Sequence, residues 1–321
     1  DIFTDKKYRH PVFSGRYNFS FNQIVDDRPY KANQNHDIGL RILTPGSEYG
    51  GDDITLKMKS KQSNEVIVAL PDNRSFINEL RDSLKIERYL RLTTTNKLAQ
   101  YEQIKESIRE EMRQRRENAK LFLKDSLKEA DVFVNGDKAQ LSSKDISSRI
   151  NEALGRLVST VYHKLSYIDT AMDEGSIRKL FNTTDQQSFD IGEVQEANTN
   201  ALSDLFNHIS AGAQNHTKTS LRTIKDRFTS APYGFVDPDI EWLVANLFKK
   251  GQISFTVNGE NISLANRTSD EIIRFITKKE YLDKLLTDVR RRPPAYQIKS
   301  VKDILKDLFN HPVNTPNEDV L

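Results

Sequence analysis

Residues 237–264 read DPDIEWLVANLFKKGQISFTVNGENISL and carry the clearest structural signal in the chain. Asp237 followed by Pro238 is typical of a helix start, because an acid caps the first turn and proline is tolerated at the first helical position. Gly251 ends the helix. Between these points the apolar residues recur at the spacing of one buried helix face: Ile240, Leu243, Val244, Leu247 and Phe248.

A β-hairpin is predicted directly after this helix. Apolar and polar residues alternate over 253–257, as in a strand with one buried face. Asn258-Gly259 is the type I′ turn sequence of a two-residue hairpin loop, and the alternation returns over 260–264. The segment therefore predicts a helix followed by a two-stranded ribbon.

Two more helices are predicted upstream, over 196–213 and 218–229. Three helices followed by a hairpin is the order of a winged-helix domain, in which the third helix and the wing can meet DNA. We place this domain at 196–292. Thr268 to Glu271 is a capping-box pattern that predicts a further helix through about Arg290.

The first ninety residues, 1–92, predict a small mixed α/β unit. Alternating apolar residues indicate strands near 17–21, 38–42 and 54–58, and the unbroken apolar run 66–70 indicates a strand covered on both faces. A helix should follow Pro71-Asp72-Asn73. We expect this helix to bury three apolar side chains: Phe76, Leu80 and Leu84.

Residues 93–170 predict a helical hairpin with a short β-hairpin, which the Asn135-Gly136 turn sequence indicates at 132–137. The stretch 96–130 has an apolar stripe and no Gly or Pro, and 143–169 repeats apolar residues at steps of three and four. We expect the two helices to pack antiparallel as a stalk, which is either an arm for a partner or a brace within the chain. Residues 171–195 are expected to form a linker, and 293–321 a tail or the start of another domain. The predicted fold class is α+β and mostly helical.

Composition excludes several classes of function. The 48 Lys and Arg nearly balance the 46 Asp and Glu, for a net charge of +2, so any polyanion site must be local. The absence of cysteine removes disulfides, thiolate catalysis and cysteine metal sites. The longest apolar run, 66–70, is far shorter than a membrane span. We expect a soluble cytoplasmic protein, and the start at Asp1 without Met suggests an excised segment.

Duplex DNA is one candidate partner of the winged-helix domain. Basic or polar side chains on its second, third and fourth helices could contact phosphates or bases. The candidates are Lys218, Arg222, Lys225, Arg227, Asn246, Lys249, Lys250, Arg290, Arg291 and Arg292. The objection is that Asp237, Asp239 and Glu241 would repel a phosphate backbone. A protein-docking role without nucleic acid therefore stays open.

Trp242 is the only tryptophan and lies beside the core stripe of the third helix. An exposed Trp is a typical partner anchor, although this one could also fold over the wing. Both the DNA and the docking interpretations require that the third helix keep an exposed face and that the ribbon stand free beside it.

No catalytic or metal site is predicted from the residues. The chain has no G-x-x-x-x-G-K-[ST] phosphate loop and no G-x-S-x-G, and its six histidines form no ligand set. Asp26-Asp27 and Asp52-Asp53 could supply carboxylates for a metal-dependent nuclease, but adjacent loop acids usually face solvent. That third hypothesis requires carboxylates that converge in a cleft.

Several stretches, in their order, resemble the interior of BrxC, the large P-loop protein of BREX phage-defence systems, and of its relative PglY. They are 19–26, the strand 65–71 with its helix, Val134-Asn135-Gly136, 161–165, and Pro232-Tyr233-Gly234-Phe235 leading into 242–248. The resemblance covers about Phe19 to Arg292.

This resemblance implies a segment of a large bacterial ATPase that acts with other defence proteins to restrict phage DNA replication and allow host methylation. The missing Walker A loop means that no catalytic residue is carried over, and that ATP and Mg²⁺ are expected only in another part of the parent. The implied partners are other BREX proteins, possible copies of the parent ATPase and possible duplex DNA, with no membrane.

Overall fold

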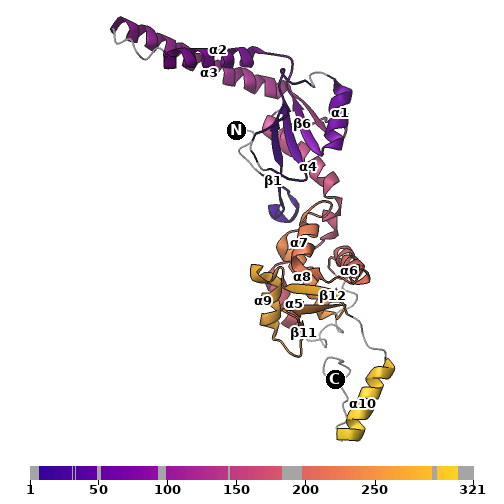
Figure 1. The fold of residues 1–321 in the computed structure, drawn as a ribbon. Coiled ribbons are helices and arrows are strands. Elements are labelled where there is room, and N and C mark those ends of the chain that lie inside the picture. The colour runs from indigo at the N-terminus through magenta and orange to yellow at the C-terminus, as the bar shows by residue number, and fades with distance from the viewer. Residues whose placement is uncertain are drawn as a thin grey trace. The chain divides into compact units, whose positions relative to one another are not determined.

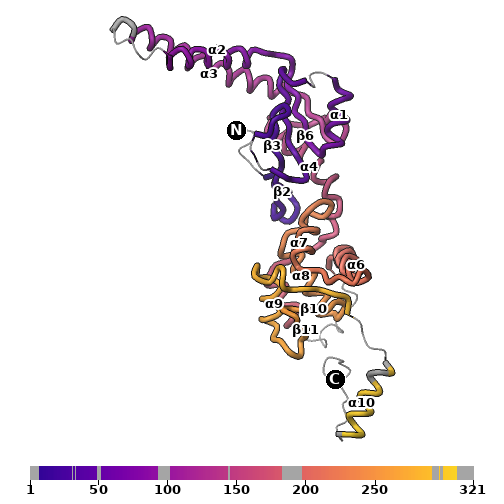
Figure 2. The backbone as a smooth tube through the Cα atoms, viewed as in Figure 1, coloured from indigo at the N-terminus to yellow at the C-terminus, as the bar shows by residue number. Residues whose placement is uncertain are grey.

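The computed structural model describes residues 7–30, 32, 34–48, 52–92, 99–143, 145–182, 197–290 and 295–309. The fold is α+β and mostly helical, as predicted (Figure 1). It divides into two compact units, 1–161 and 162–321, which can be followed along the backbone in Figure 2. The division between Val161 and Tyr162 lies before the expected linker at 171–195.

The first unit contains a six-stranded sheet in the order β4-β3-β5-β6-β7-β8. Strands β3, β5 and β6 are parallel, and the others join antiparallel. The bounds are β3 (Asn22–Val25), β4 (Arg28–Pro29), β5 (Gly39–Leu43), β6 (Glu65–Ala69), β7 (Asp131–Val134) and β8 (Asp137–Lys138). A separate ribbon pairs β1 (Lys7–Arg9) with β2 (Asn18–Ser20). Strands β5 and β6 match the predicted positions, and β6 is buried as expected of a strand covered on both faces.

The strand expected at 54–58 is wrong, because these residues form helix α1 (Asp53–Gln62). The Asp52 carboxylate accepts hydrogen bonds from the backbone N–H groups of Ile54 and Thr55, which satisfies two otherwise unpaired donors of the first turn. Ile54 and Met58 are exposed and only Leu56 is buried. The alternation of apolar and polar residues over 54–58 therefore does not mark a strand with one buried face.

Helices α2 (Ser75–Leu92) and α3 (Ala99–Glu129) form a hairpin that projects from the sheet (Figure 1). The long helix was predicted, but its expected partner was wrong: α3 packs on α2, not on the helix after it. Ion pairs connect the helices: Arg115 lies 3.3 Å from Glu79 and 3.9 Å from Asp82, and Arg116 lies 2.9 Å from Glu87.

Helix α4 (Ile146–Val161) lies against β6 and β7 instead. Its apolar seam covers one face of the sheet: Ile150, Ala153, Leu154, Leu157 and Val158 are buried. Sheet strands and helices both offer an apolar surface to such a seam, so the spacing alone could not distinguish the two partners.

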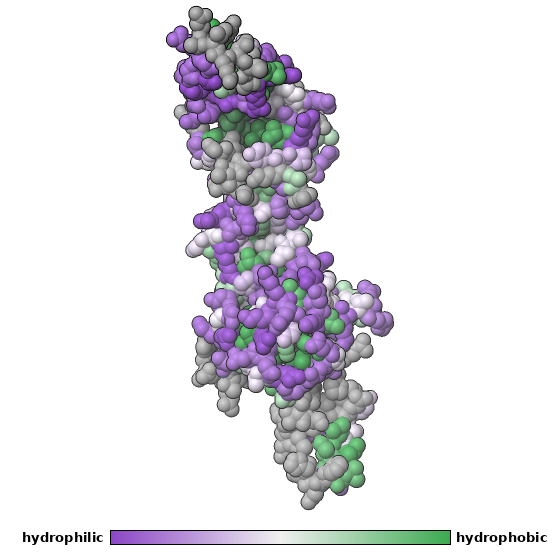
Figure 3. Space-filling view, turned by 60° about the vertical axis from the view of Figure 1, so that its left-hand side comes forward, coloured by the Kyte–Doolittle hydropathy of each residue, from purple (hydrophilic) through white to green (hydrophobic). Residues whose placement is uncertain are grey.

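The second unit combines helices with a four-stranded sheet in the order β11-β10-β12-β9. Its main elements are α5 (Glu174–Asn182), α6 (Thr199–Gln214), β9 (Thr219–Ser220), α7 (Leu221–Thr229), α8 (Asp237–Lys249), β10 (Ile253–Val257), β11 (Glu260–Ile262), α9 (Ser269–Thr277), β12 (Leu285–Val289) and α10 (Ala295–Phe309). Short 3₁₀ turns lie at His163–Tyr167 and Lys279–Tyr281. The exposed side chains of α10 include Val301, Ile304 and Leu308, and Figure 3 shows hydrophobic residues gathered on this helix.

The predicted hairpin is present but does not stand free. Strands β10 and β11 pair antiparallel around Asn258 and Gly259, both at positive φ as a type I′ turn requires. The other edge of β10 pairs with β12, over residues that were expected to continue a helix. That helix, α9, begins with the predicted capping box at Thr268 but ends at Thr277. The wing is therefore part of a larger sheet, contrary to expectation.

Within the described residues, no helix is both long enough and apolar enough for a membrane crossing.

Candidate interaction site

Helix α8 is the element that the sequence proposes as the recognition helix, and it is enclosed. Val236 precedes it, Pro238 occupies its first turn, and Lys250 caps its end. Of its 13 residues, the ten from Asp239 to Phe248 are all buried. A helix that reads a DNA groove needs one open face along its length. Helix α8 has no such face.

The covering layer comes from both sides of α8 in the sequence. Helices α6 and α7 and strand β10 pack on α8 as in a winged-helix core, and α5 and α9 pack on it in addition. Arg178 of α5 donates to Asp270 of α9 at 2.8 Å and so connects the two covering helices. The surface that would face DNA in an open winged helix is therefore occupied by the chain itself.

The acids of α8 have internal partners. Asp239 is fully buried, and its Oδ1 accepts a hydrogen bond from the Met172 N–H at 2.8 Å. The Glu241 carboxylate lies 2.6 Å from the Lys225 ammonium, which is also 3.3 Å from Asp237. Burial raises the pKa of the Glu241 carboxyl above its ordinary value, and the Lys225 ammonium opposes this rise. The acids expected to repel DNA are instead engaged by groups within the second unit.

Trp242 and Asn246 are buried, so Trp242 does not offer the exposed anchor that was one of the two alternatives left open for it. Their exposed fractions are 7% and 5%. Helix α5 lies within residues 171–195, which were expected to form a linker. The sequence does contain a signal for this helix, because the apolar residues Ile177, Leu180 and Phe181 follow one another at helical spacing. In the structure Ile177 is fully buried.

Most of the basic candidates are engaged within the second unit. Lys218 was expected on a helix but directly precedes strand β9. Its ammonium group donates a hydrogen bond to the Thr256 hydroxyl at 3.0 Å. Arg222 of α7 donates to Asp283 at 2.8 Å. Lys225 is the partner of Glu241 described above. These three side chains do not form one basic surface.

The remaining candidates are dispersed. Arg227 on α7 and Lys250 at the end of α8 are exposed. Lys249 donates to the backbone carbonyl of Leu180 in α5. Arg290 follows β12 and is partly exposed, and its N–H donates to the Gln252 carbonyl. Arg291 and Arg292 lie outside the described residues.

The acids proposed for a nuclease have structural roles in the first unit. Asp26 accepts from the Thr44 N–H at 2.7 Å, and Asp27 accepts from Arg41 at 3.2 Å. Asp52 caps α1. In the part of the chain that the structure describes, no group of three or more potential metal-binding side chains comes together.

A cavity of about 480 Å³ borders the carboxyl ends of β5 and β6, the edge where open α/β sheets commonly bind ligands. Its lining includes Asp72, which forms an exposed ion pair with Arg74 at 3.7 Å. Asp72 thus lies in the turn that follows strand β6, where its side chain is exposed.

The burial of Trp242 predicts weak quenching of its fluorescence. Iodide is a charged quencher that stays in water, so we expect it to quench the native chain much less than the chain unfolded in urea. Because Trp242 is the only tryptophan, the signal reports α8 alone. Equal quenching of the native and unfolded chains would contradict the enclosure of α8. The measurement is a Stern–Volmer titration with chloride as the ionic-strength control.

Two family models match the chain, one for each unit. Residues 1–157 match the BREX ATP-binding protein BrxC 4th domain with six-stranded beta sheet, and the sheet described above has six strands. Residues 162–291 match the BREX ATP-binding protein BrxC winged helix-turn-helix domain. No solved structure matches the chain. The junction between the matches, at 157–162, coincides with the division of the fold at Val161. The chain therefore belongs to the BrxC family of BREX ATP-binding proteins and comprises its fourth domain and its winged helix-turn-helix domain.

Proposed function

We propose that this chain is a non-catalytic, protein-docking segment of a BREX ATP-binding protein, and that its winged-helix domain does not read DNA through α8. The observation that carries the exclusion of DNA is the burial of α8 from Asp239 to Phe248 under α5 and α9. Both interpretations required an open face on α8, so the docking that we propose uses another surface of the chain.

The distribution of charge supports the same choice. Non-specific DNA binding depends on several Lys and Arg side chains that are free to contact phosphates on one surface. Here Arg222 and Lys225 are paired with acids, and Lys249 donates to a backbone carbonyl. The net charge of +2 adds no long-range attraction.

The partners that we propose are other BREX proteins and further copies of the parent ATPase. ATP and Mg²⁺ are expected to bind elsewhere in the parent, because the chain has no phosphate-binding loop. A docking segment of this kind would connect the parent to its partners in phage defence.

Two titrations test the proposal. In the first, fluorescence anisotropy follows labelled duplex DNA with increasing amounts of the chain at low and moderate salt, and we expect no binding at either. In the second, the chain is titrated against each purified BREX protein from the same system, and we expect saturable binding to at least one. Salt-dependent DNA binding that is lost on reversing the charges of Arg222 and Arg227 would overturn the proposal.

A further inference from the structure

Helix α2 carries an apolar face that the described part of the chain leaves uncovered. The sequence predicts that Leu80 and Leu84 are core residues, but they are 46% and 51% exposed. They line an open groove of about 460 Å³ along the helix. The described residues that line it are Ile77, Leu80, Arg81, Leu84, Lys85 and Arg88.

This groove is a continuous face of one helix. At about 100° per residue, the six lining residues fall within an arc of about 140° on the side away from the hairpin seam. The opposite side of α2, which includes the buried Phe76 and Ser83, packs on α3. The groove face is thus directed outward because α3 already occupies the other one.

Among the described residues, the polar part of the lining is basic. Arg81, Lys85 and Arg88 flank the apolar residues, and no acid is among the described lining residues. Lys85 pairs with Asp82 at 2.9 Å, but both side chains are largely exposed, so water screens the pair. Arg81 and Arg88 form no ion pair among the described residues. An apolar centre with a basic rim is complementary to a helix with an apolar stripe and an acidic rim.

We propose that this α2 groove binds an acidic amphipathic helix of another BREX protein. The inference rests on the proposed docking function and names its surface and the chemistry of its partner. Apolar side chains of the incoming helix would cover Leu80 and Leu84, and its Glu or Asp side chains would face Arg81, Lys85 and Arg88. Binding would extend the α2–α3 hairpin to a three-helix arrangement.

The basic rim disfavours two other occupants. A second copy docked through the same face would place the same three cations against each other across a two-fold axis. A lipid surface would attract the cations, but the groove offers only two largely exposed leucines for insertion, whereas interfacial helices bury a long apolar face.

Synthetic peptides test the proposal on the full chain. The probe is a fluorescent 18-residue helical peptide with leucines at i, i+3, i+4 and i+7 spacing and glutamates on the flanks, and the comparison peptide carries lysines in place of the glutamates. We expect the acidic peptide to bind and the basic one not to bind. Reversing three exposed charges with Arg81→Glu, Lys85→Glu and Arg88→Glu should weaken binding by about tenfold or more.

Matched variants separate the groove from general effects. The triple variant Lys278→Glu, Lys279→Glu and Lys284→Glu changes the net charge equally on exposed residues of the second unit and should bind the peptide like the unmodified chain. Leu84→Glu should abolish binding, whereas Leu121→Glu, at a position 55% exposed on α3, should not. Circular dichroism confirms that each variant is folded.

Four outcomes would overturn the inference. The first is that acidic and basic peptides bind equally well, and the second is that the triple variant at 278, 279 and 284 weakens binding as much as the triple variant at 81, 85 and 88. The third is that the chain dimerises in sedimentation experiments and Leu84→Glu abolishes the dimer. The fourth is that the chain co-sediments with phosphatidylserine vesicles and the triple variant at 81, 85 and 88 abolishes this. Failure of the groove inference can be distinguished from failure of the proposed docking function. If a BREX protein binds the chain and the α2 variants bind it equally well, docking stands and the groove is not its site.

Discussion

Lys225→Met is expected to lower the free energy of unfolding of the second unit by about 3–5 kcal/mol, because it leaves the buried Glu241 charge without its partner. The side chains of Lys225 and Glu241 are only 11% and 10% exposed, and their charged atoms are 2.6 Å apart. Water can therefore solvate the remaining carboxylate only poorly. Urea unfolding followed by Trp242 fluorescence measures the loss, since Trp242 lies next to Glu241 on α8.

The effect of this substitution should depend on pH. Burial raises the pKa of Glu241 in the folded chain, so the folded state holds the proton more tightly than the unfolded state. The stability that Glu241 contributes is therefore complete below the unfolded pKa and declines as the pH rises toward the folded pKa. Removing Lys225 removes the cation that opposes the rise, so the folded pKa increases further. We expect the deficit of Lys225→Met to be smaller at mildly acidic pH than at neutral pH.

The double variant Lys225→Met with Glu241→Leu is the matched control. It replaces both charges by apolar groups, and we expect it to recover most of the stability lost by the single variant. A single variant as stable as the unmodified chain, or a deficit that grows as the pH falls, would show that Glu241 is solvated and that α8 is not enclosed.

Local signals in the sequence predicted local structure well. Helix α8, the Asn258-Gly259 turn and the Thr268 capping box are each fixed by residues within a few positions of one another. The covered strand β6 was also predicted, because a run of Val and Ile needs no distant information to indicate burial on both faces.

Predictions that depended on distant partners were less successful. The seam of α4 matched a helix as well as it matched the sheet that it covers. Strand β12 was assigned to a helix, although Leu285 and Thr287 are its buried positions and alternate as a strand requires. The sequence left the exposure of Trp242 open, and it did not predict α5, which contacts α8 from outside the expected domain. The sequence therefore placed Trp242 and Asn246 correctly on α8 but did not predict that α5 and α9 cover this helix. For this reason α8 is no longer a candidate interaction surface.

The α2 groove is the converse case. Sequence spacing predicted that Leu80 and Leu84 would be buried, and in the described chain they are exposed. Helical periodicity records which face of a helix is apolar, but not whether the chain itself or another molecule covers that face. The conflict between the pattern and the structure therefore points to an interface.

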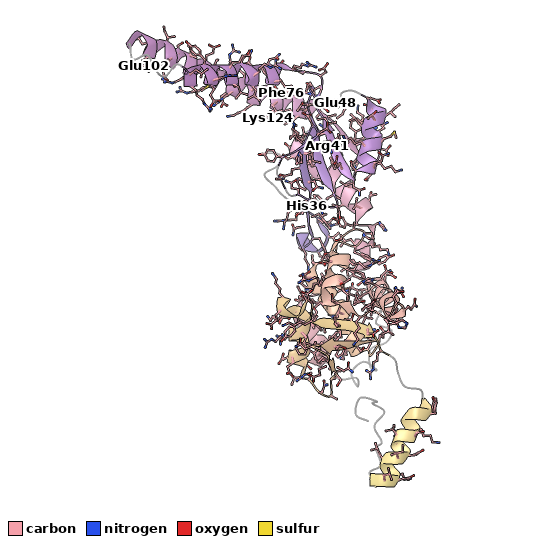
Figure 4. All side chains as sticks on the ribbon, in the orientation of Figure 1. His36, Arg41, Glu48, Phe76, Glu102 and Lys124 are labelled. Carbon is pink, nitrogen blue, oxygen red and sulfur yellow. The ribbon has the colours of Figure 1, made fainter. Side chains whose placement is uncertain are left out.

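Arg41→Met is expected to destabilise the first unit by a similar amount, about 3–5 kcal/mol. Arg41 lies on the central strand β5 (Figure 4) and donates two hydrogen bonds to Glu65 of β6, at 2.6 and 2.9 Å. Their side chains are 11% and 8% exposed. The absence of a side chain at Gly39 leaves room for Glu65, because a Cβ atom on residue 39 would lie only 2.8 Å from the Cγ atom of Glu65. Glu65 is thus buried beside β5, and its carboxylate loses both of these hydrogen bonds when Arg41 is removed.

Hydrogen–deuterium exchange can locate this loss within the sheet. We expect Arg41→Met to speed exchange in β3, β5 and β6, since Arg41 also donates to the Asp26 carbonyl after β3 and so connects all three parallel strands. Arg74→Met removes an exposed arginine whose pair with Asp72 is solvent-screened, and it should leave these strands unchanged. Arg41→Met with Glu65→Met should restore slow exchange, because no buried charge then remains. Unchanged exchange in the single variant would mean that the Glu65 carboxylate is satisfied without Arg41, and that the parallel core of the first unit depends on apolar packing alone.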